Sequence, residues 1–132
     1  MTKVMAFGSF DVLHEGHKYY LKEAKSYGHL IVIVARDSNI EKFKDKKPIN
    51  DENKRLKNIK DLDFVDEAVI GGENIFDVLE EHKPDIICLG YDQSTASEER
   101  IKEELSKRNL KAEIVRCKAF KPEIFKSSKI KN

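Results

Sequence analysis

Two histidines separated by a glutamate and a glycine are the residues best placed to do chemistry in this sequence. His14, Gly16 and His17 follow a short apolar run and stand where an amphipathic stretch begins. Imidazoles donate hydrogen bonds to phosphate oxygens, and a glycine lets a phosphate approach the backbone closely. A helix that starts here would favour the same anion through its first N–H groups and its dipole. The pattern predicts a polyphosphate site that also stabilises charge in a transition state.

The residues just before the histidines are consistent with that site. Gly8 and Ser9 are small enough to let the end of a strand approach a nucleotide, and Phe10 follows them. Asp11 is interpreted as structural, holding the loop together. For the histidine pattern taken alone, two ordinary surface histidines near a helix start are an equal alternative, because short motifs often match by chance. The surrounding residues favour the functional interpretation.

A cluster of basic residues follows the second apolar run. A solvated, lysine-rich loop is the usual explanation for such a cluster, and a clamp on phosphates or on an anionic acceptor is the functional one. The planar guanidinium of Arg55 suits phosphate or acceptor recognition, although an ion pair with Asp51 or Glu52 on a helix surface is an alternative. The lysines of the cluster are Lys42, Lys44, Lys46 and Lys47.

Two further segments are candidates for contact with a nucleotide. Gly90 and Asp92 follow the fourth apolar run, where they form either a simple turn or a contact with base, ribose or metal. Ser127 and Ser128 lie in the basic tail, where their hydroxyls serve as a helix cap or as donors to phosphate.

Alternating apolar runs and amphipathic stretches predict the elements that position these residues. Apolar runs of this length suit strands buried on both faces of a parallel sheet. Residues 36–50 are predicted to be a loop or a frayed helix, and Tyr27 is expected on the packing face of the first helix. Strands are predicted at 4–7, 30–35, 66–70, 85–89 and 112–116, and helices at 17–27, 51–62, 74–82 and 97–108.

This order predicts an α/β fold, a Rossmann-like, doubly wound, five-stranded parallel sheet in a single domain over residues 1–132. Such sheets bind ligands beyond the carboxyl ends of the strands, where the strand order reverses. The loops after the first and fourth strands are therefore expected to meet at the site.

Composition narrows the possible partners and compartment. The 132 residues carry a net charge of only +1, which argues against a nucleic-acid partner. No apolar stretch approaches the length of a membrane span, and no signal peptide is recognised, so a cytoplasmic protein is expected. Cys88 and Cys117 are far apart in the sequence, which argues against a disulfide framework or a zinc site.

The segment from Gly8 to His17 resembles the first loop of the cytidylyltransferase-like nucleotidyltransferase superfamily. In that family this loop reads Gly-Thr/Ser-Phe-Asp followed by His/Thr-x-Gly-His. The resemblance implies that His14 and His17 contact the triphosphate and stabilise the transition state at the α-phosphorus. It also implies a catalytic lysine in the basic cluster, best assigned to Lys46. The remaining matches are Lys44, Lys47 and Arg55 for phosphate or acceptor, and Gly90, Asp92, Ser127 and Ser128 for the nucleotide.

Within the superfamily, several segments are similar to archaeal FAD synthases, a group that transfers AMP from ATP to FMN with a divalent metal, Mg²⁺. These segments are 34–37, 47–49, 65–66, 83–87 and 89–90. The metal would bridge phosphates, so no protein metal ligand is expected. A glycerol-3-phosphate cytidylyltransferase, a heptose-phosphate adenylyltransferase and a non-catalytic nucleotide-binding module are the alternatives. The sequence does not separate ATP from CTP, and related enzymes are often homodimers.

Overall fold

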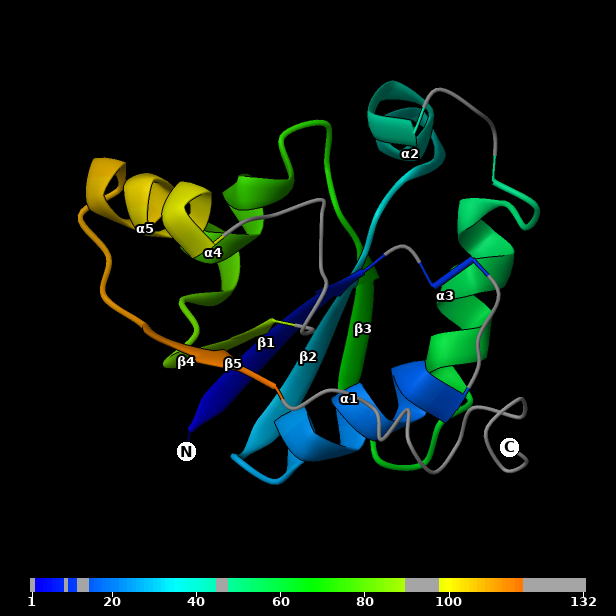
Figure 1. Ribbon diagram of the computed structural model, residues 1–132, viewed down its shortest axis with the longest axis horizontal. Helices are drawn as coiled ribbons and strands as arrows, with labels where there is room; N and C mark the ends of the chain where they lie inside the picture. Colours follow the sequence, from blue (N-terminus) through cyan, green and yellow to red (C-terminus); the bar gives the residue numbers. More distant parts are fainter. Residues whose placement is uncertain (1, 9, 12–14, 45–47, 90–97, 118–132) are drawn as a thin grey trace, which may run out of the picture.

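Five parallel strands form one sheet, with helices on both faces (Figure 1). The computed structural model describes residues 2–8, 10–11, 15–44, 48–89 and 98–117, without the side chains of 39 and 42–44. The strand order is β3-β2-β1-β4-β5, so the chain builds outward from β1 on one side and then crosses to the other. The strands are β1 (Lys3–Gly8), β2 (His29–Val34), β3 (Glu67–Ile70), β4 (Ile86–Leu89) and β5 (Glu113–Arg116).

The order in which strands are added reverses after β3, and this places a topological switch point between β1 and β4. β1 pairs with β2 along its whole length, from Lys3–His29 to Gly8–Val34. β1 pairs with β4 only from Val4–Ile86 to Ala6–Cys88. The end of β1 therefore extends past its pairing with β4, at the edge of the sheet where parallel sheets bind ligands.

Helices cover the two faces of the sheet according to the alternation of strand side chains. Val4 and Ala6 of β1 point to the face covered by α1 and α3, whereas Met5 and Phe7 point to the face covered by η1, α4 and α5. Both faces of the central strands are therefore buried, which explains their continuous apolar sequences. The helices are α1 (Glu15–Lys25), α2 (Asp37–Lys44), α3 (Glu52–Lys60), the 3-10 turn η1 (Ile75–Asp77), α4 (Val78–His82) and α5 (Glu98–Lys107).

The observed elements confirm the predicted fold, with local differences. Residues 36–50 contain a true helix, α2. The first helix begins at Glu15, two residues before its predicted start, so His17 lies in its first turn. Tyr27 was wrongly expected on the packing face: it lies beyond the end of α1 and is 39% exposed.

Two side chains cap the elements that follow them. The side chain of Asp51 accepts the N–H of Lys54 at 2.8 Å and begins α3. Asn74 accepts the N–H of Phe76 at 3.0 Å, but it begins a 3-10 turn that passes into α4 rather than one continuous helix.

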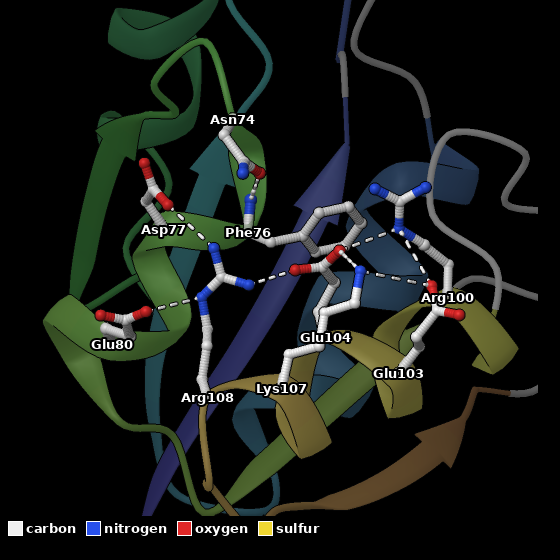
Figure 2. A network of polar contacts seen from close by, with 9 residues as sticks. All are labelled: Asn74, Phe76, Asp77, Glu80, Arg100, Glu103, Glu104, Lys107 and Arg108. Atoms are coloured by element: carbon white, nitrogen blue, oxygen red, sulfur yellow. Dashed lines mark hydrogen bonds and ion pairs between the residues drawn. The ribbon is translucent and has the colours of Figure 1, made fainter.

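A network of charged side chains holds α5 against η1 and α4 (Figure 2). Arg108 of the α5 end pairs with Asp77 at 2.9 Å, with Glu80 at 2.8 Å and with Glu104. Glu104 is buried and also accepts a hydrogen bond from Arg100 Nε at 3.1 Å. The network links elements that are far apart in the sequence, and Glu104 lies at its centre.

The two cysteines are neighbours in space although they are distant in the sequence. Both are buried, free thiols, and the N–H of Cys117 donates to the carbonyl of Leu89 beside Cys88 at 2.8 Å. The hydrogen bond with Cys88 and then burial raise the pKa of the Cys117 thiol well above its ordinary value. Among the described residues, no helix is long and apolar enough to cross a membrane.

Candidate active site

The loop after β1 turns sharply as soon as the strand ends. Phe10 adopts a left-handed backbone conformation, with a φ of 53°, and its side chain is 2% exposed. A non-glycine residue in this region carries backbone strain that the surrounding structure must offset. Here the ring packs back into the core on the α1 side of the sheet.

Gly8 makes that turn possible because the aromatic ring covers it. A Cβ atom at position 8 would lie 2.6 Å from Cζ of Phe10, far inside a normal contact. The ring is buried, so it has little room to move away. Gly8 is therefore required by the close approach of Phe10, a structural reason beyond its predicted closeness to a nucleotide.

The same phenylalanine ring contacts the second motif histidine. The Phe10 and His17 rings meet edge to face, with centroids 5.3 Å apart and planes at 81°. Aromatic pairs favour this geometry, which restricts the rotation of the imidazole. Gly8, Phe10 and His17 thus form one packed unit at the carboxyl end of β1.

His17 lies in the first turn of α1, at the positive end of the helix. First-turn N–H groups have no acceptor within a helix, and the dipole adds a partial positive charge there. The helix is long enough for this effect, extending over 11 residues from Glu15. An anion such as a phosphate group would be stabilised at this end beside the His17 imidazole.

A second tie joins the motif loop to the segment before α3. The carboxylate of Asp11 accepts the N–H groups of Ile49 and Asn50, each at 2.8 Å. The Asn50 side chain donates in return to the Asp11 carbonyl at 2.5 Å. Asp11 is therefore structural, as predicted, and it fixes residues 48–50 close to the end of β1.

Arg55 continues this network from inside α3. Its guanidinium is 0% exposed and donates to the carbonyl of Ala35 at 2.6 Å, to Asp37 at 2.6 Å and to the carbonyl of Asn50 at 3.0 Å. These contacts join the end of β2, the start of α2 and the segment before α3. Arg55 is thus buried, and the ion pair described here is with Asp37, not one on the helix surface.

The arrangement of β1, its loop and α1 can now be compared with known proteins. The cytidylyltransferase-like family profile matches residues 5–132. This chain belongs to the cytidylyltransferase-like family. An FAD synthase of Ferroglobus placidus is 49% identical over 98% of this chain and 86% of its own length. An FAD synthase of Thermococcus sibiricus is 44% identical over 97% of this chain and 88% of its own.

A solved structure agrees with the fold as well as with the sequence. The lipopolysaccharide core biosynthesis protein of Thermoplasma volcanium is 44% identical and superposes with a TM-score of 0.83. The alignment covers 91% of this chain and 98% of that one. The fold, and the switch point between β1 and β4 with it, is therefore that of a cytidylyltransferase-like protein.

The structure brings together some of the family's predicted site residues. Gly8, Phe10, Gly16 and His17 lie at the end of β1 and the start of α1, and Arg55 lies in the adjoining network. Lys44 is the last residue of α2, and its side chain is outside the described part. The others outside the described residues are Ser9, His14, Lys46, Lys47, Gly90, Asp92, Ser127 and Ser128.

Two functional positions were missed in the sequence. Asn50 joins Asp11 to Arg55 through its side chain and its carbonyl. Asp37 was not singled out, although it pairs with Arg55. The sequence offers no signal for that pair, because a partner 18 residues away is selected by the tertiary fold, which brings the start of α2 to the Arg55 side chain.

The donor atoms of the described residues do not suit a resident metal in this family member. No group of three or more His, Cys, Asp or Glu residues able to hold a metal ion occurs among them. Hard cations such as Mg²⁺ are often held mainly by substrate phosphates.

Proposed function

We propose that this chain is an FAD synthase, which transfers AMP from ATP to FMN and releases pyrophosphate. The observation that carries the proposal is the 49% identity with an FAD synthase over 98% of the chain. It is supported by the geometry of Gly8, Phe10 and His17 at the mouth of α1. A nucleotidyltransferase needs a triphosphate site at this position of a doubly wound sheet.

The reaction needs positioning and charge stabilisation more than proton transfer. An oxygen of the FMN phosphate attacks the α-phosphorus of ATP in line and forms the new P–O–P bond. The bond from the α-phosphorus to the bridging oxygen of the β-phosphate breaks, and that oxygen leaves with pyrophosphate. The attacking phosphate is already an anion at neutral pH, so no general base is required.

His17 and the first turn of α1 stabilise the charge that develops on the α-phosphate oxygens. The edge contact with Phe10 holds the imidazole in one orientation, so little reorganisation is needed during the reaction. His14, which precedes α1 in the sequence, and Lys46, which follows α2, are proposed to act on the same phosphates. A Mg²⁺ ion bound with ATP would neutralise part of the phosphate charge.

The remaining predicted residues have supporting roles in the proposal. Arg55 is proposed to act by holding residues 48–50 in place, because its guanidinium already bonds three protein oxygens. The residues proposed to line the nucleotide are Gly8, Ser9, Phe10, Gly16, Gly90, Asp92, Ser127 and Ser128, and Lys44 and Lys47 are proposed to meet phosphate or acceptor. Action in the cytoplasm and as a homodimer is part of the same proposal.

A steady-state comparison of substrates tests the proposed function. The purified chain is given ATP with FMN, CTP with glycerol 3-phosphate, and ATP with a heptose phosphate, each with Mg²⁺. The last pair is included because the Thermoplasma volcanium relative is named for lipopolysaccharide core biosynthesis. We expect FAD and pyrophosphate in equal amounts, with kcat/KM at least about 100-fold above the other pairs. No FAD with Mg²⁺ present, or nucleotide binding without pyrophosphate release, would reject the proposal.

A further inference from the structure

Tyr20 of α1 reaches from the helix into the space between two strands. Its side chain is buried, and its hydroxyl lies 2.7 Å from the carbonyl of Cys88 in β4. The same hydroxyl is 3.3 Å from the N–H and 3.4 Å from the carbonyl of Phe7 in β1. One side chain thus contacts the ends of both strands that border the switch point.

The hydroxyl stands where the pairing of β1 with β4 ends. The last pair of that ladder is Ala6–Cys88, whereas β1 continues to pair with β2 as far as Gly8–Val34. A hydroxyl that accepts from Phe7 and donates to Cys88 fills the place where the two strands begin to separate. The separation opens the crevice that ligands occupy in sheets of this type.

The chemical state of the hydroxyl suits this bridging role. Burial, followed by the nearby Cys117 and Cys88 thiols, raises the pKa of Tyr20 well above its ordinary value. The hydroxyl therefore keeps its proton and donates it to the nearer acceptor, the Cys88 carbonyl. Its oxygen accepts the Phe7 N–H at the same time.

Tyr20 also lies one helical turn after His17. Residues three apart share a helix face, so fixing Tyr20 against the sheet fixes the rotation and depth of the first turn of α1. The strand end that Tyr20 contacts leads directly into Gly8 and Phe10, which pack against His17. The two paths from Tyr20 to the imidazole, through α1 and through β1, end at the same ring.

We propose that the Tyr20 hydroxyl is a positioning group for nucleotidyl transfer, which bridges β1 and β4 at the switch point and sets the place of His17 over the α-phosphate. The proposal rests on the proposed function for its kinetic consequence, but not for the structural one. A misplacement of about 1 Å in a reacting geometry can cost on the order of 100-fold in rate, so a distant hydroxyl can matter for turnover.

The test replaces Tyr20 by Phe, which keeps the ring and its apolar contacts and removes only the oxygen. Tyr27→Phe is the matched control, since Tyr27 is exposed beyond the end of α1. Both are measured well below their melting temperatures, so that a loss of stability alone leaves the kinetics unchanged. We expect Tyr20→Phe to lower kcat by about 10-fold or more, with the KM for FMN little changed, and Tyr27→Phe to match the wild type.

A spectroscopic measurement tests the same proposal without turnover. Histidine side chains are labelled, and the His17 ring signals, which sense the Phe10 ring, are followed by NMR. We expect Tyr20→Phe to shift the His17 signals while those of His29 and His82 stay in place. Unchanged His17 signals together with an unchanged kcat would overturn the positioning role.

The two readouts separate this inference from the proposed function. A wild type that makes no FAD, with His17 signals that still move in Tyr20→Phe, rejects the function and supports the positioning role. If the wild type makes FAD, Tyr20→Phe makes it at the same rate, and the His17 signals do not move, the positioning role alone is rejected.

If Tyr20→Phe does not fold, p-aminophenylalanine at position 20 is used instead, because its amino group keeps a hydrogen-bond donor but is a weaker acceptor. A lower kcat and a shift of the His17 signals support the proposal, and wild-type values of both overturn it.

Discussion

At the scale of residues, a single aromatic ring organises the described part of the candidate active site. Phe10 has a left-handed backbone conformation, and its ring packs over Gly8 and contacts the His17 ring edge to face. Each of these features depends on the others, since a side chain at position 8 would displace the ring that orients the imidazole. His17 is thus an oriented group at a helix N-terminus rather than a mobile surface histidine.

We predict that His17→Ala lowers kcat by about 100-fold or more while the fold is retained, because one donor to the transition state is lost. Steady-state FAD formation gives the rate, and circular dichroism reports the fold. His82→Ala, at the end of α4, serves as the control and should behave as the wild type. Normal turnover in the His17 variant would show that the imidazole does not act on the substrate.

At the scale of elements, the segment before α3 is attached to the motif loop mainly through backbone groups. Asp11 accepts two N–H groups from this segment, and Arg55 donates to its Asn50 carbonyl. Removal of the Asp11 carboxylate should therefore loosen residues 48–50, which follow Lys46 and Lys47 in the sequence, without touching the core of the sheet.

We predict that Asp11→Ala lowers the free energy of unfolding by about 1–3 kcal/mol, the usual range when a charged hydrogen-bond acceptor is removed. The KM for ATP or FMN should rise, because residues 48–50, next to the proposed phosphate-binding lysines in the sequence, are held less firmly. Urea unfolding and initial rates measure the two effects. Asp63→Ala, an exposed aspartate in the turn after α3, is the control. Equal stability and equal KM in the two variants would show that the tie has no consequence.

The charged network on the other face joins α5 to η1 and α4 and should make stability depend on pH. Burial acts to raise the pKa of the Glu104 carboxyl, but hydrogen bonds from Arg108 and Arg100, and the nearby Lys107, outweigh it and lower that pKa. A carboxyl with a lowered pKa in the folded state stabilises the fold above its ordinary pKa. That contribution disappears as the pH falls through the lowered value.

We predict that Glu104→Gln is less stable than the wild type at pH 7, and that the difference in free energy of unfolding shrinks as the pH falls below about 4.5. Urea unfolding at several pH values between 3 and 7 gives this difference. Glu103→Gln, an exposed neighbour on the same helix, should show a smaller effect throughout. A Glu104→Gln difference that is constant with pH, or larger in acid, would contradict the account.

For the whole molecule, local patterns were sufficient for the architecture. Apolar runs became the central strands, because a strand buried on both faces shows no alternation, and the polar stretches between them became helices. The family was also predicted from residues 8–17, and its profile matches residues 5–132. These features depend on residues close together in the chain, which a sequence displays directly.

Contacts between distant segments were not predictable in the same way. Arg55 pairs with Asp37, Tyr20 reaches Cys88, and Cys117 lies beside Cys88 only because the helices and strands pack in one register. A periodic pattern shows which face of a helix is buried but not which atom meets it. The supports of the active site were therefore found in the structure, whereas its motif was found in the sequence.

A crystal structure of the chain with a non-hydrolysable ATP analogue, Mg²⁺ and FMN tests the central claim most directly. The account predicts the α-phosphate at the start of α1, within hydrogen-bond distance of the His17 imidazole, with the FMN phosphate in line behind it. A triphosphate bound away from the carboxyl ends of β1 and β4, or a His17 ring directed away from it, would contradict the account.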